Sequence, residues 1–96
     1  MSLTGKQKKY LRSLAHHKPV IVTIGNAGLS DAVINEIIAS MESHELLKIK
    51  LPGARASEKK QLLLDICEKT QSSFVQLIGR VGVIYRPNEQ PKIELP

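Results

Sequence analysis

The chain has 96 residues, of which 42% are hydrophobic and 24% charged, so it can form one modest core and has no room for a second domain. Fourteen Lys and Arg residues against nine Asp and Glu residues give a net charge of +5 and a pI near 9.6, which favours polyanionic partners. The apolar runs are too short to cross a bilayer, and no secretory signal is found, so we expect residues 1–96 to form a single cytoplasmic domain.

The first expected element is a basic amphipathic helix over residues 5–16. Thr4 and Gln7 have the spacing of a capping box, and Lys9 and Arg12 fall opposite the apolar side. Residues 1–18 contain no acidic residue and these basic ones: Lys6, Lys8, Lys9, Arg12 and Lys18. Such a segment is typical of a nucleic-acid surface or of a solvated helix face, and charge alone does not choose between them.

A strand and a glycine turn follow. The β-branched run 20–24 predicts a strand buried on both faces. The turn after it consists of Gly25, Asn26, Ala27 and Gly28, and Ser30 is the expected N-cap of a helix over residues 31–43. Backbone N–H groups at such a junction suit a phosphate, although many strand-to-helix turns bind nothing and Asp31 opposes an anion.

The next expected elements are a half-buried strand and a third helix. Residues 46–51 alternate, so that Leu46, Lys48 and Lys50 share one wet, basic side. Ser57 is the expected N-cap of a helix over residues 58–70.

The last elements are a hairpin and a tail. Strands at 74–78 and 81–86 are separated by Gly79-Arg80, which predicts a tight hairpin. Gly82 marks either a bulge or a close approach of another element. Residues 87–96 form an extended, proline-rich tail whose Ile93 and Leu95 alternate well enough to dock.

The order αβαβαββ predicts an α+β fold, a two-layer α/β sandwich with a mixed four-stranded sheet. Two short right-handed crossovers place the helices at 31–43 and 58–70 on the same face of the sheet.

The residues indicate no catalytic or metal-binding site. His16, His17 and His44 lack partners at ligand spacing, and Cys67 lies in a leucine-rich helix where a small buried residue is expected. The turn at 25–28 lacks the Lys-Ser/Thr pair of a P-loop and the third glycine of a dinucleotide fingerprint. We therefore expect no enzyme activity, no cofactor and no small-molecule substrate.

A G-x-x-G turn can clamp a nucleic-acid backbone, as in KH domains, but there it joins two helices and here it joins a strand to a helix. Because the basic helix leads into the strand that delivers the turn, we expect helix and turn to form one surface, extended by Lys48, Lys50, Arg55 and Arg80. Aromatic residues are few and Phe74 is expected in the core, so recognition should rest on phosphates and RNA shape.

Four segments stand out in order along the chain: KQKKYLRSLAHH at 6–17, IGNAGL at 24–29, HELLKIK at 44–50 and QLIGRVGVIYRP at 76–87. Together they resemble the CRM domain family (chloroplast RNA splicing and ribosome maturation), and most of all its single-domain, YhbY-like bacterial members. The resemblance implies RNA binding, association with precursors of the large ribosomal subunit, and a fold similar to the C-terminal domain of the third bacterial translation initiation factor. It also implies that the turn at 25–28 and the basic surface near it contact RNA.

The sequence therefore predicts a monomeric RNA-binding factor of large-subunit assembly that acts without catalysis. The candidate RNA contacts are the turn residues Gly25, Asn26, Ala27 and Gly28, together with Lys6, Lys8, Lys9, Arg12, Lys18, Lys48 and Lys50. The alternative is a protein adaptor on the ribosome, in which the exposed strand face binds a ribosomal protein.

Overall fold

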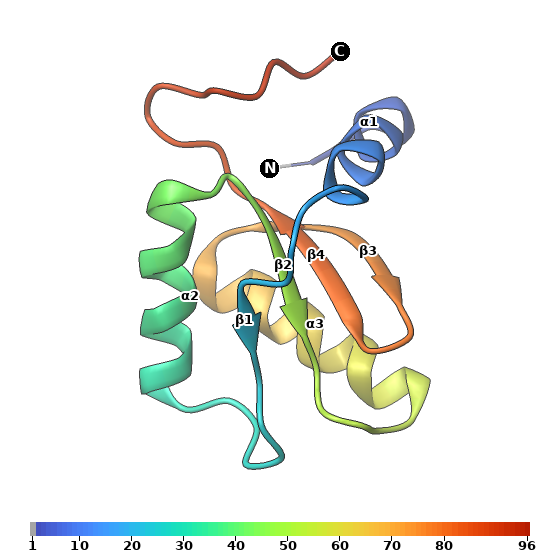
Figure 1. The fold of residues 1–96 in the computed structure, drawn as a ribbon, viewed down its shortest axis with the longest axis vertical. Coiled ribbons are helices and arrows are strands. Elements are labelled where there is room, and N and C mark those ends of the chain that lie inside the picture. The colour runs from blue at the N-terminus through green and yellow to red at the C-terminus, as the bar shows by residue number, and fades with distance from the viewer. Residues whose placement is uncertain (1) are drawn as a thin grey trace.

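The computed structural model describes residues 2–96 as three helices and four strands in the expected order. They are α1 (Gly5–Ala15), β1 (Val22–Thr23), α2 (Asp31–Ser43), β2 (Leu46–Lys50), α3 (Ala56–Thr70), β3 (Ser73–Ile78) and β4 (Val81–Tyr85). The strands form one sheet in the order β1-β2-β4-β3, with β1 parallel to β2 and β4 antiparallel to both of its neighbours (Figure 1). The predicted α+β class and mixed sheet are confirmed.

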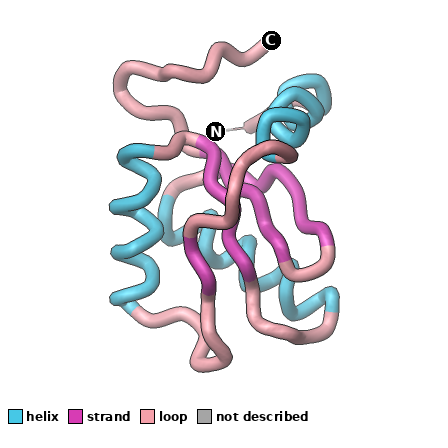
Figure 2. The backbone as a smooth tube through the Cα atoms, viewed as in Figure 1, coloured by secondary structure: helices cyan, strands magenta, loops and turns pink. Residues whose placement is uncertain are grey.

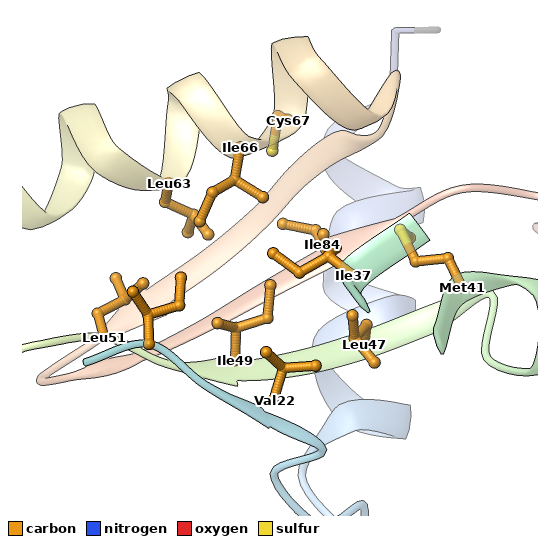
Figure 3. Close-up of a cluster of buried hydrophobic side chains, with 11 residues drawn as sticks. Val22, Ile37, Met41, Leu47, Ile49, Leu51, Leu63, Ile66, Cys67 and Ile84 are labelled. Carbon is orange, nitrogen blue, oxygen red and sulfur yellow. The ribbon is translucent and has the colours of Figure 1, made fainter. Parts of the chain in front are cut away.

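The main core lies between the sheet and the helices α2 and α3 (Figure 3). Leu47 and Ile49 of β2 meet Ile37 of α2 and the side chains of Leu63 and Ile66 of α3, and all five are fully buried. Burial of each such side chain stabilises the fold by roughly 1.5–3 kcal/mol. Both helices therefore cover the same face of the sheet, as the two crossovers predicted.

A second, smaller cluster covers one end of the opposite face. It contains Leu11 and Ala15 of α1, the strand residues Leu46, Val75, Val83 and Tyr85, and the partly buried tail residues Ile93 and Leu95. The docking predicted for the tail is confirmed, and Figure 2 shows the tail and α1 at the same end of the molecule. The two layers are thus the sheet and α2 with α3, and α1 adds a partial third layer.

This second cluster corrects the prediction for Leu46. The alternation of residues 46–51 assigned Leu46 to the wet side of its strand, but it is only 3% exposed. It is on the predicted side, which α1 and the tail cover at this end of the sheet. On the same side of the strand Lys48 is half-buried and Lys50 is exposed, so solvent exposure on this side increases from Leu46 to Lys50.

The prediction of a strand at 20–24 buried on both faces is wrong. Val22 and Ile24 are buried in the main core, whereas Val20 and Ile21 are 39% and 40% exposed. The reason is the place of β1 at the edge of the sheet, where α2 covers one face and nothing in the second cluster covers the other. Pairing with β2 continues past the strand, since the Ile24 N–H donates to the Lys50 carbonyl at 2.8 Å.

Two of the three predicted helix starts are confirmed. Thr4 and Gln7 form the reciprocal capping box of α1, and the Ser30 hydroxyl accepts a hydrogen bond from the Val33 N–H. The prediction of Ser57 as the third N-cap is wrong, because Arg55 has the extended cap conformation and makes no side-chain cap bond. Ser57 falls instead within the first turn of α3.

Gly82 lies where α3 passes close to β4. A Cβ atom at this position would be 2.7 Å and 2.8 Å from the two Cδ atoms of Leu63, whose side chain is fully buried. Of the two alternatives for Gly82, the close approach is therefore right. The sheet irregularity falls in β3 instead, between Phe74 and Gln76.

We expect Gly82→Ala to lower the free energy of unfolding by about 1–3 kcal/mol, because the added methyl overpacks against Leu63. Gly53→Ala is the matched control, since a Cβ there meets nothing within 4 Å. Urea denaturation of both variants beside the parent provides the measurement. A Gly82→Ala variant as stable as Gly53→Ala would show that Leu63 moves away without cost.

Candidate functional site

Acidic residues are segregated from one side of the molecule. None of the nine Asp and Glu residues belongs to α1 or to any strand. They are Asp31, Glu36 and Glu42 on α2, Glu58, Asp65 and Glu68 on α3, and Glu45, Glu89 and Glu94 in the connection after α2 and the tail. Because α2 and α3 cover one face of the sheet, the opposite face is formed by α1, the strands and the tail. Of these elements only the tail, which covers one end of this face, carries carboxylates.

Much of that opposite face is open to solvent. We call the part that α1 and the tail leave uncovered the open sheet face, formed by Ile21, Thr23, Lys48, Lys50, Gln76, Ile78 and Val81. Lys48 and Lys50 project from the same side of β2, about 7 Å apart along the strand. The face therefore carries a short row of ammonium groups on a rigid strand.

The glycine turn lies at the end of this row. It is closed by a hydrogen bond of 3.1 Å from the Gly28 N–H to the Gly25 carbonyl, and Gly28 has the positive φ of +79° that favours glycine. The side chains of Asn26 and Ala27 are exposed, and their N–H groups have no partner among residues 2–96. Since Ile24 pairs with Lys50, the turn begins where the row of lysines ends.

The N-terminus of α2 lies three residues beyond the turn and is already partly satisfied. Ser30 accepts from the Val33 N–H at 3.2 Å, and Asp31 places an exposed carboxylate in the first helical turn. Both groups make this helix end less attractive to a phosphate. The free N–H groups of Asn26 and Ala27 are the better donors for an anion.

Helix α1 lies at the far end of the sheet from the turn (Figure 1). Helix and turn are thus connected through β2, and Lys48 is the link between them. Arg12 and His16 line a hollow together with Lys48. The structure therefore brings Arg12, Lys48 and Lys50 onto one face of the sheet, with the turn at the end of that face.

Other predicted residues lie away from that line. Lys6 and Lys9 are exposed on α1, and Lys8 is half-buried beside Phe74 at the start of β3. Lys18 is exposed beside the tail residues Ile93 and Glu94.

Two arginines border the end of the sheet near the turn. Arg80, in the hairpin, donates from Nε to the Leu51 carbonyl at 3.0 Å, so its position is fixed. Arg55 is exposed and lies 3.9 Å from the Glu58 carboxylate, which offsets part of its charge. Arg80 is therefore the better placed of the two to extend the basic surface.

Sequence reasoning missed Gln76 as a residue of this face. It is half-buried and lines the same hollow as Arg12 and Lys48. The irregularity at 74–76 places it on the same side as Val75, which strict alternation does not allow. The available signal was a single amide in the otherwise apolar run FVQLI.

Glu45 is the second residue that was missed, because its place just beyond a polar helix face suggested solvent. It is only 5% exposed, and its carboxylate accepts hydrogen bonds of 2.7–2.9 Å from the N–H groups of Asn88, Lys92 and Ile93. Burial raises the pKa of Glu45, but these three donors and the charge of Lys92 outweigh it and hold the pKa below its ordinary value. Glu45 thus fixes the tail over the second cluster.

The chain's one cysteine lies in the main core. Cys67 is buried as expected, and burial raises the pKa of its thiol against a smaller opposing effect of Ser72. Such a thiol is a poor nucleophile. Within residues 2–96 no group of three or more His, Cys, Asp and Glu side chains is placed to hold a metal ion, and no helix is long and apolar enough to cross a membrane.

These features define a small basic α+β domain with a carboxylate-free sheet face and a glycine turn at its end. The profile of the CRS1/YhbY (CRM) domain matches residues 3–86, and the chain belongs to this family. The resemblance found in the four sequence segments is therefore confirmed.

Similar proteins cover nearly the whole chain. An RNA-binding protein of Haemophilus influenzae is 41% identical over 95 residues, which is 99% of this chain and 96% of the relative. The Bacillus subtilis protein YqeI, named a probable RNA-binding protein, is 37% identical and covers 98% of this chain and 99% of its own length. The solution structure of the hypothetical protein SAV1595 from Staphylococcus aureus, for which RNA binding has been suggested, matches with a TM-score of 0.87 and 44% identity over 99% of this chain and all of its own.

Proposed function

We propose that this protein binds RNA on the α1 side of its sheet, through Arg12, Lys48, Lys50 and the turn at 25–28. The observation that carries the proposal is the segregation of charge, since no carboxylate belongs to α1 or to any strand. A polyanion is attracted to such a face and repelled by α2, which carries three acidic residues and no basic one. The relatives from Haemophilus influenzae and Bacillus subtilis bear names that agree with RNA as the ligand.

Phosphates are the groups that this face is suited to bind. Lys48 and Lys50 supply point charges, and the turn supplies free backbone N–H groups. Because Gly25 and Gly28 have no side chains, an RNA strand can approach the backbone of the turn closely. Contacts of this kind fix the position of an RNA but do not read its sequence. The remaining α1 lysines, Lys6, Lys8 and Lys9, and Lys18 add long-range attraction.

We further propose that the RNA is structured ribosomal RNA and that the protein acts as a monomeric, non-catalytic, cytoplasmic factor in assembly of the large subunit. This part rests on the family to which the chain belongs. The burial of Cys67, the chain's one thiol, agrees with a role in binding.

A second candidate is a protein adaptor on the ribosome. Two large apolar side chains of the open sheet face favour this adaptor function, because Ile78 is 65% exposed and Ile21 is 40% exposed. Large apolar side chains at these levels of exposure suit a protein partner as well as a nucleic acid.

Salt dependence separates the two functions. If about four phosphates are neutralised, the logarithm of the affinity for deproteinised large-subunit ribosomal RNA should fall with the logarithm of salt concentration at a slope of about −3 to −4. Filter binding at salt concentrations of about 50–300 mM gives this slope directly. A flat response, or attachment to ribosomal particles that survives nuclease, would support the adaptor.

The same titration tests the turn. Ala27→Asp adds a negative charge to an exposed position and should weaken RNA binding at least ~10-fold, the effect of about 1.4 kcal/mol. Ala39→Asp makes the same change at an exposed position of α2, on the other side of the sheet, and should bind as the parent does. Equal affinities of the two variants would remove the turn from the proposed surface.

A further inference from the structure

The hollow beside α1 is not explained by phosphate binding alone. It has a volume of about 270 Å³ and lies between the C-terminal end of α1 and the strands β2, β3 and β4. Its floor includes Val81, which is half-buried, and Val83, which is 3% exposed. An apolar floor of this kind gains nothing from a phosphate.

Ala15 and Ile78 add to the apolar lining, and the polar residues that complete it include no carboxylate. Arg12, His16 and Lys48 stand around the hollow, and Gln76 is half-buried within it. The Gln76 amide, with two N–H donors and a carbonyl acceptor, has no hydrogen-bond partner among residues 2–96. The hollow thus combines cations, an apolar floor and one free amide.

These three features match the phosphate of a nucleotide, the face of its base and the edge of its base. The cations suit its phosphate, the valines suit the face of a base, and an amide can donate to and accept from the edge of a base. A phosphate ion would leave the accessible apolar side chains of Ile78 and Val81 in water, and a purely apolar ligand would leave the cations without counter-charges. The charge of the lining therefore favours a nucleotide over a hydrophobic peptide segment.

We propose that the hollow takes one unpaired RNA nucleotide, with its base against Val81 and Val83, its edge at the Gln76 amide and its phosphate between Arg12 and Lys48. This inference rests on the proposed RNA function and narrows it. A base within a continuous A-form helix is stacked on both sides and cannot enter, whereas a bulged or looped base can turn outward.

The position of the hollow predicts the path that the bound RNA backbone follows over the sheet. From Lys48 the row continues to Lys50 and then to the turn at 25–28. A strand whose unpaired nucleotide lies in the hollow therefore has its neighbouring phosphates along β2 and at the turn. The ligand class is a helix interrupted by an unpaired nucleotide.

The test compares three RNA hairpins that differ at one position: an unpaired nucleotide, the same backbone with an abasic site, and a fully paired stem. The unpaired nucleotide is made in all four base identities, and affinities are measured by fluorescence anisotropy beside the affinity for large-subunit ribosomal RNA. We expect the best of the four bulged hairpins to bind at least ~10-fold more tightly than the abasic and paired hairpins, since a good base contact is worth about 1–3 kcal/mol.

Gln76→Ala separates the base contact from the phosphate contacts. It should remove most of the advantage of the bulged hairpin and leave affinity for the abasic hairpin unchanged, whereas Gln90→Ala, at an exposed position in the tail, should change neither. Equal affinity for all three hairpins, or an equal loss on the bulged and abasic hairpins, would overturn the nucleotide site. If ribosomal RNA binds with the expected salt slope in that case, the proposed function survives, and if no RNA binds, both fail.

Discussion

Replacing Lys48 and Lys50 together by Gln should reduce the slope of RNA affinity against salt by about two, because each lysine that contacts a phosphate accounts for about one unit. At physiological salt we expect the affinity to fall by roughly 10- to 100-fold, which corresponds to about 0.7–1.4 kcal/mol for each of the two contacts. The effect should be similar for RNAs of different sequence, since phosphate contacts carry no sequence information. Filter binding over a range of salt concentrations measures both quantities.

The control for this variant is Lys60→Gln with Lys69→Gln, two exposed lysines of α3 on the other side of the sheet. Each of the two double variants lowers the formal net charge of the protein by two units from the parent's value of +5. If net charge alone governs binding, the two double variants will lose affinity equally. A loss confined to the β2 variant would locate the contacts on the open sheet face.

The open face exists because α1 is short and lies at one end of the sheet. Leu11 and Ala15 anchor the helix over β2, β3 and β4, and the tail fills the space beside it. Within residues 2–96 nothing covers the same side of β1, so Ile21 and Thr23 remain exposed. The sheet thus has a fully covered face that holds the main core and a half-covered face on which the cations stand.

Local signals along the chain were sufficient for the order of elements. The capping box of Thr4 and Gln7, the N-cap Ser30 and the Gly79-Arg80 hairpin all depend on residues close in sequence, and the structure agrees with each. The same is true of the amphipathic helices, whose apolar stripes depend only on spacing.

The errors concern contacts between elements far apart in the sequence. The exposure of Ile21 depends on the edge position of β1, and the burial of Leu46 depends on α1 and the tail. Glu45 has the composition of a surface residue, and only the return of residues 88–93 buries it. For the candidate site, the basic residues could be listed from the sequence, but the separation of Lys18 from Lys48 required the fold.

Glu45→Gln is expected to destabilise the fold more than any other change of an acidic residue proposed for this protein. The Glu45 carboxylate accepts from three backbone N–H groups, and an amide in its place turns its own N–H₂ group toward one of those donors. Hydrogen bonds to a charged group contribute about 1.5–3 kcal/mol, so we expect a loss of about 2 kcal/mol. In a domain of this size that loss lowers Tm by roughly 10 °C.

The exposed Glu42, in the last turn of α2, supplies the control, and Glu42→Gln should leave stability within about 0.5 kcal/mol of the parent. Amide exchange adds a local measurement, because protection of the Asn88, Lys92 and Ile93 N–H groups should fall in Glu45→Gln alone. A variant with parental Tm and unchanged protection would mean that apolar docking of Ile93 and Leu95 holds the tail without the carboxylate.

The pH dependence of stability has a sign fixed by the same carboxylate. Because the pKa of Glu45 is lower in the folded protein than its ordinary value of 4.5, its contribution is fully present above pH 4.5 and is lost as the pH falls through the folded-state pKa. The parent should therefore lose more stability than Glu45→Gln on acidification below pH 4.5. Parallel stability curves for the two proteins in that range would show that Glu45 keeps an ordinary pKa and does not hold the tail by its charge.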